Sequence, residues 1–271
     1  MSFGPLVEAD WLREHLGEAG LVVVDCRFVL GQPGAGEAAW LEGHIPGAAV
    51  LDVDRDLSAE PGARGRHPLP DPKAFEAAAR RAGIGDKSRV VGYDEAGEGG
   101  AARLWWLLRH FGHDEAAVLN GGLRGWREAG GELRGGRERR EAGDFVARPR
   151  EGDTATAEQI ERAVGTTPSL PLLDARAPER FRGDTEPIDP IAGHIPGARN
   201  VPAASVAPQG RFRTPQELRA ELGEQPFVAY CGSGVTACTL VLAGAVAGLE
   251  AKLYPGSWSE WIASGRPPAT S

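Results

Sequence analysis

The chain has 271 residues, of which 41% are apolar and 25% charged, a composition typical of a globular protein long enough for two ordinary domains. Its net charge of −8 argues against a nucleic-acid partner and against an anionic membrane surface. The three cysteines form no C-x-x-C pair, so we predict neither a disulfide framework nor a zinc site. The sequence shows no secretory signal and no apolar run long enough to cross a bilayer, and we therefore expect a cytoplasmic protein.

The first half of the chain alternates predicted strands and helices. Short runs of apolar residues predict buried strands over 21–25, 49–53, 89–93 and 116–119. Helical patterns cover 8–16, 37–42, 71–82 and 100–111. The third of these helices opens with Asp-Pro, a capping residue followed by a first-turn proline. Strands and helices alternating at these lengths predict an α/β fold, in which helices cover both faces of a parallel sheet.

A charged, glycine-rich segment follows these elements. Residues 136–153 show no apolar periodicity, which is typical of a linker. We therefore expect an N-terminal domain over 1–135 and a C-terminal domain over 154–271.

The second half of the chain repeats the first. The turn Gly-His-Ile-Pro-Gly-Ala at 43–48 returns unchanged at 193–198. Three further pairs of segments also correspond, namely 23–27 with 172–176, 90–94 with 227–231, and 120–126 with 254–261. Internal repeats of this length indicate two copies of one α/β domain in tandem.

The most informative stretch is the loop that starts at Cys231. An apolar run over 227–230 predicts a buried strand, and residues 235–249 predict a well-packed helix. Between them, two glycines let the backbone turn toward the cysteine side chain. The loop N–H groups and the positive end of the helix dipole favour a thiolate, so Cys231 is predicted to be a nucleophile. The alternative is a buried structural cysteine, a role that Cys238 inside the helix suits better.

The repeat also suggests which residues carry chemistry. His44 and His194 belong to the turn that both copies share, so we expect them to brace that turn rather than to act as an acid or base. Asp94 stands where the second copy has Cys231. Because a carboxylate cannot accept sulfur, the N-terminal domain is predicted to be catalytically inactive.

Together these motifs resemble the two-domain rhodanese-type sulfurtransferases, the family of thiosulfate and 3-mercaptopyruvate sulfurtransferases. The resemblance spans nearly the whole chain and includes the repeated turn, Arg103-Leu104-Trp105-Trp106 and the segment 231–237. It implies that Cys231 carries sulfur as a persulfide, receives it from a small-molecule donor and passes it to a thiol or to cyanide. No cofactor is implied, and the sequence gives no indication of the oligomeric state.

The resemblance also implies the residues of a donor-binding site. Its loop residues are Gly232, Ser233, Gly234, Val235 and Thr236. Arg182 matches the family arginine that binds the donor's carboxylate or sulfonate; its alternative is a solvated surface arginine. The thiosulfate branch often places Arg and Lys directly after the cysteine, and the Gly232-Ser233 found here favours 3-mercaptopyruvate as donor.

Two departures from the family pattern concern this site. Family members commonly carry a second arginine before the repeated turn, where this chain has Ile188-Asp189-Pro190. The mercaptopyruvate branch often has an aspartate ahead of the first-domain histidine, proposed to form a Ser-His-Asp relay with the loop serine, and Ala35 stands near that place. We therefore expect Ser233 to act as a hydrogen-bond donor without a relay.

Two other functions, and a metal site, explain the sequence less well. A cysteine phosphatase or arsenate reductase needs an arginine six positions after the cysteine, where this chain has Ala237. A non-catalytic binding module explains less well why the cysteine is kept in one copy alone. The remaining histidines, His15, His67, His110 and His113, show no metal-ligand spacing, so no metal site is predicted.

Overall fold

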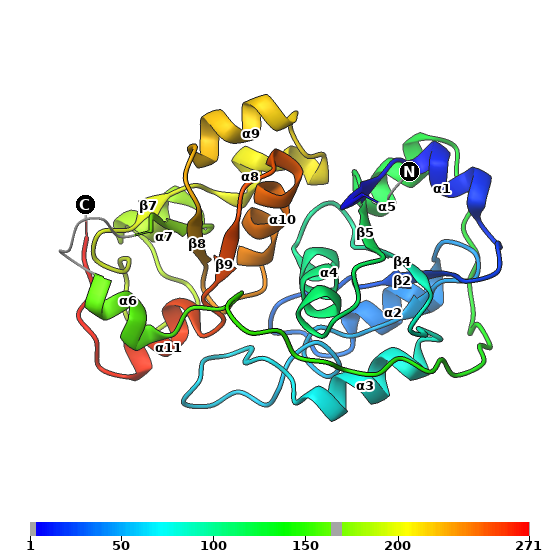
Figure 1. The fold of residues 1–271 in the computed structure, drawn as a ribbon, viewed down its shortest axis with the longest axis horizontal. Helices are drawn as coiled ribbons and strands as arrows, with labels where there is room; N and C mark the ends of the chain where they lie inside the picture. Colours follow the sequence, from blue (N-terminus) through cyan, green and yellow to red (C-terminus); the bar gives the residue numbers. More distant parts are fainter. Residues whose placement is uncertain (1–3, 164–169, 271) are drawn as a thin grey trace. The chain divides into compact units, whose positions relative to one another are not determined.

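The computed structural model describes residues 4–163 and 170–270, which divide into two compact units (Figure 1). Unit 1 comprises the residues up to Ala59 together with Pro70–Arg150 and Gln209–Phe212. Unit 2 comprises Glu60–Leu69, Glu151–Pro208 and the residues from Arg213 onward. Each predicted domain therefore contributes one short segment to the other unit.

Unit 1 is built on a parallel sheet of five strands in the order β1-β5-β4-β2-β3. In chain order the strands are β1 (Leu6–Val7), β2 (Leu21–Asp25), β3 (Ala49–Val50), β4 (Arg89–Tyr93) and β5 (Ala116–Leu119). The helices are α1 (Ala9–His15), α2 (Ala35–Glu42), α3 (Pro72–Arg81), α4 (Gly100–His110) and α5 (Gly122–Glu128). Helix α3 begins as predicted, with the Asp71 side chain accepting the Lys73 N–H at 2.8 Å.

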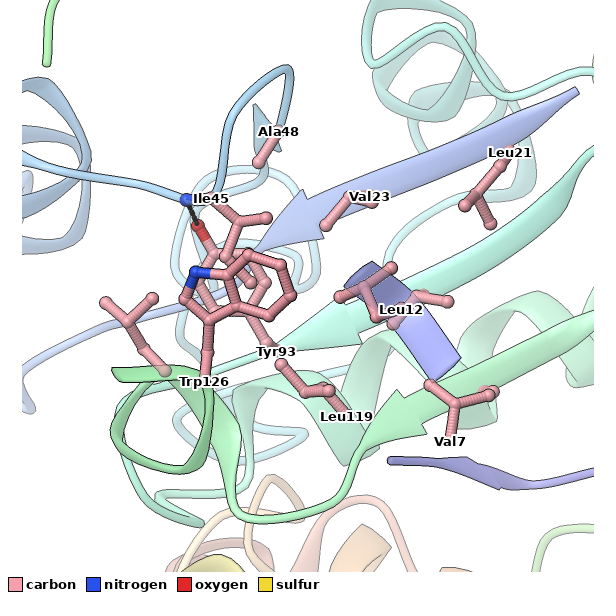
Figure 2. Close-up of a cluster of buried hydrophobic side chains, with 12 residues drawn as sticks. Val7, Leu12, Leu21, Val23, Ile45, Ala48, Tyr93, Leu119 and Trp126 are labelled. Carbon is pink, nitrogen blue, oxygen red and sulfur yellow. Dashed lines mark hydrogen bonds between the residues drawn. The ribbon is translucent and has the colours of Figure 1, made fainter. Parts of the chain in front are cut away.

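Apolar side chains fill both faces of this sheet. On one face, strands β2, β4 and β5 pack against Leu12 of α1 and Trp126 of α5 (Figure 2). Helix α4 also packs against β4 and β5, where its Leu104 side chain lies next to Gly92. Figure 2 also shows the Tyr93 hydroxyl accepting the Ile45 N–H, which ties the repeated turn to the sheet.

Unit 2 has a four-stranded parallel sheet in the order β7-β6-β8-β9. The strands are β6 (Leu172–Asp174), β7 (Arg199–Asn200), β8 (Phe227–Tyr230) and β9 (Ala251–Leu253). The helices are α6 (Ala157–Ala163), α7 (Pro178–Arg182), α8 (Ala203–Val206), α9 (Pro215–Leu222), α10 (Ala237–Ala247) and α11 (Ser257–Ala263). Helices α8 and α9 pack against α10, which contacts β8 and β9, while α6 and α11 pack against the opposite face (Figure 1).

The two sheets confirm the predicted tandem α/β fold, since the order β9-β8-β6-β7 matches β5-β4-β2-β3. A buried polar network is repeated as well. In unit 1, Arg27 binds the Asp25 carboxylate, which also accepts the Tyr93 hydroxyl. In unit 2, Arg176 binds the Asp174 carboxylate in the same way. Each arginine also donates to the carbonyl that precedes the repeated histidine, at 2.7 Å in both units.

The two repeated histidines brace their turns. His44 is fully buried, bonds the Trp40 carbonyl through Nδ1 at 2.7 Å, and pairs through its backbone with Arg134. His194 bonds the Phe181 carbonyl through Nδ1 at 2.8 Å and pairs through its backbone with Ala269. These contacts account for the turn motif as part of the fold.

The segment predicted to be a linker is partly packed. Within 136–153, the residues up to Arg150 belong to unit 1, where Phe145 is buried and meets Phe75 edge to face. The Glu138 carboxylate accepts the Gly47 N–H at 3.1 Å. Part of the predicted linker is thus packed against unit 1. Its composition does not reveal this, because only a few of its side chains make the contacts. Over 4–163 and 170–270, no helix has the length and apolarity needed to cross a membrane.

Candidate active site

Cys231 lies in the loop between β8 and α10, as predicted from the sequence. Its side chain is buried, with 3% of the residue exposed, and its Sγ accepts the Gly234 N–H at 3.1 Å. Gly234 has a φ of +83°, and a Cβ there would lie 2.2 Å from the Pro255 carbonyl oxygen. The close turn that brings this N–H to the sulfur therefore requires glycine. A backbone donor in this position stabilises negative charge on the sulfur.

The start of α11 holds the other end of the loop. The Cys231 N–H donates to Ser257 Oγ at 3.1 Å, and the Cys231 carbonyl accepts the Trp258 N–H at 3.0 Å. The Gly232 carbonyl accepts the Ser259 N–H at 2.9 Å. The closing motif over 254–261, which the sequence repeat identified, thus fixes the backbone of the residue that carries the sulfur.

Ser233 has a partner that the sequence did not reveal. His67 Nδ1 lies 2.7 Å from Ser233 Oγ, and both residues are buried. His67 comes from the segment Glu60–Leu69, which folds into unit 2. Because Ala35 stands where the family often has an aspartate ahead of His44, we expected Ser233 to act without a relay. The structure shows that a histidine does contact Ser233. The partner is the histidine of another segment, 166 residues away in the chain.

The segment carrying His67 is anchored beside the loop. Gly65, at a φ of +99°, leaves no room for a side chain, since a Cβ would lie 2.8 Å from both the Gly256 carbonyl oxygen and Ser259 Oγ. The Arg66 N–H donates to the same Ser259 hydroxyl at 3.1 Å. This close approach delivers Arg66 and His67 to the side of the cysteine loop.

Two arginines approach Gly232, the residue after the cysteine, and two acids pair with them. We call Arg66, Arg180, Glu186 and Asp189 the charge cluster. The two guanidinium groups are those nearest to the Cβ position that Gly232 leaves empty, with Arg66 Nη2 at 2.8 Å and Arg180 Nη2 at 3.5 Å. Asp189 binds Arg66 through one oxygen and Arg180 Nη2 through the other, the latter at 3.3 Å.

The pKa values of the two acids in the charge cluster shift in opposite directions. Arg180 Nη2 donates to Glu186 at 2.6 Å. Burial opposes ionisation of Glu186, but the hydrogen bonds from Arg180 and from the Asp189 N–H lower its pKa overall. For Asp189, burial raises the pKa above its ordinary value; Glu186 adds to that rise, while Arg66 and Arg180 oppose it. With all four residues ionised, the formal charge of the cluster is zero.

Of the remaining predicted site residues, those of the cysteine loop lie at the site and Arg182 does not. Gly232, Ser233 and Val235 are buried in the loop, and Thr236 stands directly before α10. Arg182 ends α7 with 47% of its side chain exposed and pairs with Asp184 at 2.8 Å. The arginine of α7 that reaches Gly232 is Arg180, so the structure does not bring Arg182 into the site where the resemblance put it.

The other two cysteines differ from Cys231. Cys26 is fully buried, and burial together with the carboxylates of Asp25, Asp94 and Asp56 raises the pKa of its thiol well above the ordinary value. Cys238 lies inside α10 and donates to the Gly234 carbonyl at 3.3 Å. In the parts of the chain that the structure describes, no group of three or more His, Cys, Asp or Glu side chains is arranged to hold a metal ion.

Comparison with known proteins identifies both halves of the chain. The family of rhodanese-like domains matches residues 8–129 and again 156–264. A Pseudomonas aeruginosa protein provisionally named a 3-mercaptopyruvate sulfurtransferase is 44% identical, over 100% of this chain and 99% of its own. A Mycobacterium tuberculosis protein provisionally named a thiosulfate sulfurtransferase is 45% identical, over 88% of this chain and 87% of its own.

Solved structures agree with these matches. The crystal structure of SseA from Escherichia coli, described as a 3-mercaptopyruvate sulfotransferase of rhodanese fold, superposes with a TM-score of 0.83. It is 34% identical, and the match covers 96% of this chain and 100% of that one. The 3-mercaptopyruvate sulfurtransferase from Leishmania major superposes with a TM-score of 0.85 at 29% identity, over 98% of this chain and 76% of that one.

Proposed function

Since this chain belongs to the rhodanese family of sulfurtransferases, we propose that it transfers one sulfur atom from 3-mercaptopyruvate to cyanide or a thiol through a persulfide on Cys231. The observation that carries the proposal is the buried Cys231 Sγ, which accepts the Gly234 N–H at 3.1 Å in the glycine loop that leads into α10. A loop of this kind stabilises a thiolate and, once sulfur is bound, the terminal sulfur of the persulfide.

The reaction balances in two steps. In the first, the Cys231 thiolate bonds to the donor's sulfur, and the carbon–sulfur bond breaks with its electron pair moving to the pyruvate enolate, which then takes up one proton. In the second, the acceptor attacks the outer sulfur of the persulfide. The sulfur–sulfur bond breaks, and its electron pair returns to Cys231 as a thiolate.

Ser233 and His67 are the pair that we propose as the source of the enolate's proton. Ser233 stands two residues after the nucleophile, and its hydroxyl lies 2.7 Å from His67 Nδ1. A hydroxyl backed by an imidazole can pass a proton outward and be resupplied from the ring. Arg180 is proposed to bind the donor's carboxylate, the role that the family resemblance implied for Arg182.

The second candidate donor is thiosulfate, which the name of the Mycobacterium tuberculosis relative suggests. It reacts by the same persulfide route, with sulfite leaving in place of pyruvate. The charge cluster favours mercaptopyruvate, because its two arginines are already balanced by Glu186 and Asp189. A dianion therefore brings one more uncompensated charge to the site than a carboxylate does.

Two measurements test the proposal. Intact-protein mass spectrometry after donor treatment is expected to show one added sulfur atom on Cys231 and none on Cys26 or Cys238. Assayed side by side with cyanide as acceptor, mercaptopyruvate is expected to exceed thiosulfate by about ten-fold in kcat/KM. Protein that gains no sulfur from either donor would contradict the function, whereas equal use of both donors would contradict the preference alone.

We also propose that the protein works in a reducing, cytoplasmic setting without nucleic-acid or membrane partners. Its three cysteines are unpaired, and the proposed persulfide cycle needs Cys231 as a free thiolate. The net charge of −8 disfavours binding to other polyanions.

A further inference from the structure

Among the residues that the structure describes, Arg66 is the charged side chain nearest to the Cβ position of Gly232, the residue after the nucleophile. Its Nη2 is 2.8 Å from the Cβ position of Gly232, and the nearest atoms after it are those of Arg180, at 3.5 and 3.6 Å. Arg66 belongs to the segment Glu60–Leu69 and Arg180 to α7. Two guanidinium groups from different segments thus converge on one point beside Cys231.

The position of Arg66 is set by contacts at both of its ends. Its backbone N–H donates to Ser259 Oγ at 3.1 Å, and its Nη1 pairs with Asp189. The Asp189 side chain is 3% exposed, whereas that of Arg66 is 25% exposed, so part of the arginine side chain is open to solvent. Within the described residues, Arg66 Nε is buried and has no hydrogen-bond partner. Arg66 therefore keeps unused donor capacity beside the reactive loop.

We infer that Arg66 is a second donor-binding arginine, which grips the carboxylate of the sulfur donor together with Arg180, and that Asp189 is the residue that positions it. The inference rests on the proposed function and deepens it. A carboxylate has two oxygens and accepts hydrogen bonds from two sides, which suits two converging guanidinium groups. Asp189, with one oxygen on each arginine, ties the two groups to each other beside Gly232.

This arrangement explains the departure seen in the sequence. Where the resemblance led us to expect an arginine, between α7 and the repeated turn, the chain has Asp189. Asp189 pairs with Arg66 of the segment Glu60–Leu69, and this places a guanidinium beside the loop. Because this guanidinium is paired with Asp189, the carboxylate offsets one positive charge at the site. Asp189 thereby sets the preference for a singly charged carboxylate group over a dianion.

The main test compares Arg66→Gln with Arg64→Gln, a matched control in the same segment whose side chain is exposed. For Arg66→Gln, the KM for mercaptopyruvate is expected to rise about ten-fold, while kcat stays within about three-fold. The rate at which preloaded persulfide passes to cyanide is expected to be unchanged, since the donor has already left. Arg64→Gln is expected to keep the KM of the unmodified protein.

A double variant separates donor binding from simple bracing of the segment. Arg66→Met combined with Asp189→Leu removes both charges and leaves an apolar contact in their place. If Arg66 binds the donor, KM stays high in this protein even when its melting temperature matches that of the unmodified chain. A KM restored to the original value would show that the pair only holds the segment in place and would overturn the inference.

Asp189→Asn tests the positioning residue through donor choice. Removing its charge leaves the charge cluster at a formal +1, so the ratio of kcat/KM is expected to shift toward thiosulfate by about three- to ten-fold. Asp184→Asn is the control, since Asp184 is exposed and pairs with Arg182. An unchanged ratio in Asp189→Asn overturns the role given to Asp189.

The proposed function and this inference fail in distinguishable ways. If no persulfide forms on Cys231 of the unmodified protein with either donor at high concentration, the proposed function is wrong. If the persulfide forms but Arg66→Gln leaves both KM values within two-fold of the original, the function stands and the inference is wrong.

Discussion

The loops that follow β4 and β8 share one backbone plan and differ in the side chain at their first residue. After β4, the Asp94 carbonyl accepts the Leu123 N–H at 2.8 Å, and the next carbonyl, of Glu95, accepts the Arg124 N–H at 3.0 Å. After β8, the carbonyls of Cys231 and Gly232 accept the Trp258 and Ser259 N–H groups at 3.0 and 2.9 Å. The helix after the next strand thus clamps each loop in the same way.

The side chains inside the two loops differ in how they use the backbone N–H groups around them. The Asp94 carboxylate accepts the N–H groups of Gly97, Gly99 and Ala101, at 2.8, 3.0 and 3.3 Å. The loop of unit 1 is therefore filled by a carboxyl group of its own chain. In unit 2 the same position holds a sulfur atom, which can gain and lose a second sulfur. One loop of this chain is thus filled by its own side chain, and the other holds an atom that can react.

The largest expected effect concerns the first residue of each loop. Cys231→Ser is expected to lower turnover of both donors by about 10⁴-fold or more, because no persulfide can form without the sulfur nucleophile. Asp94→Ala is expected to leave turnover within about three-fold, since its carboxylate completes the loop of the other unit. Steady-state assays with cyanide measure both. Comparable losses in the two variants would show that the N-terminal loop takes part in the chemistry.

Ser233 gives the next largest effect. Ser233→Ala removes the hydroxyl that His67 contacts, and turnover of mercaptopyruvate is expected to fall about 10²-fold as proton delivery to the enolate is lost. Thiosulfate serves as the internal control, because its leaving sulfite needs no proton from the protein. His67→Gln is expected to act in the same direction. Equal losses with both donors would instead point to a distorted loop.

The Asp94 carboxylate also predicts how stability depends on pH. Burial and the charge of Glu98 raise its pKa to about 7, against three opposing backbone hydrogen bonds. Because the folded value lies above the unfolded one, this group's contribution to stability is complete below about pH 4 and is lost as the pH rises through 7.

The measurement is chemical denaturation at pH 5 and pH 8. Relative to Asp94→Asn, the unmodified protein is expected to lose about 2–3 kcal/mol of unfolding free energy between these two values. Persulfide formation on Cys231 is the control that shows each protein is folded. The same pH dependence in both proteins would mean that the Asp94 carboxyl does not titrate in this range.

Much of this fold follows from local pattern. Strands β2, β4, β5 and β8 have the predicted bounds because short apolar runs between turn residues leave a parallel sheet little choice of register. The tandem repeat then predicts the second sheet from the first. Cys231 was identified in the same way, since strand, glycine loop and helix are adjacent in the chain.

The partners of Cys231 were harder to predict, because they come from distant segments. His67 and Arg66 reach the loop only after Glu60–Leu69 folds into unit 2, and nothing around them in the sequence signals that contact. The assignment of Arg182 to the site differs from the structure for a local reason. Residues two apart on a helix point to different sides, so only one of them can face Gly232.

The smallest effect concerns the residue of α11 that holds the cysteine N–H. Ser257 has a φ of +55°, a conformation that non-glycine residues rarely adopt, and its counterpart in unit 1 is Gly122, with a φ of +59°. The serine hydroxyl accepts the Cys231 N–H at 3.1 Å and donates to the Tyr254 carbonyl at 2.9 Å. The second copy therefore tolerates backbone strain in exchange for a side chain that fixes the nucleophile.

Two substitutions at Ser257 separate the strain from the hydrogen bonds. Ser257→Gly keeps the backbone conformation and loses both bonds, so kcat is expected to fall about five- to ten-fold and stability by about 1 kcal/mol. Ser257→Ala loses the same bonds and keeps the strain, and it is expected to be less stable than Ser257→Gly by about another 1 kcal/mol. Thermal unfolding of the two proteins measures this order, which is the reverse of the order expected inside an ordinary helix. If alanine proves the more stable of the two, the left-handed conformation at Ser257 does not limit stability, and the likeness to Gly122 has no energetic meaning.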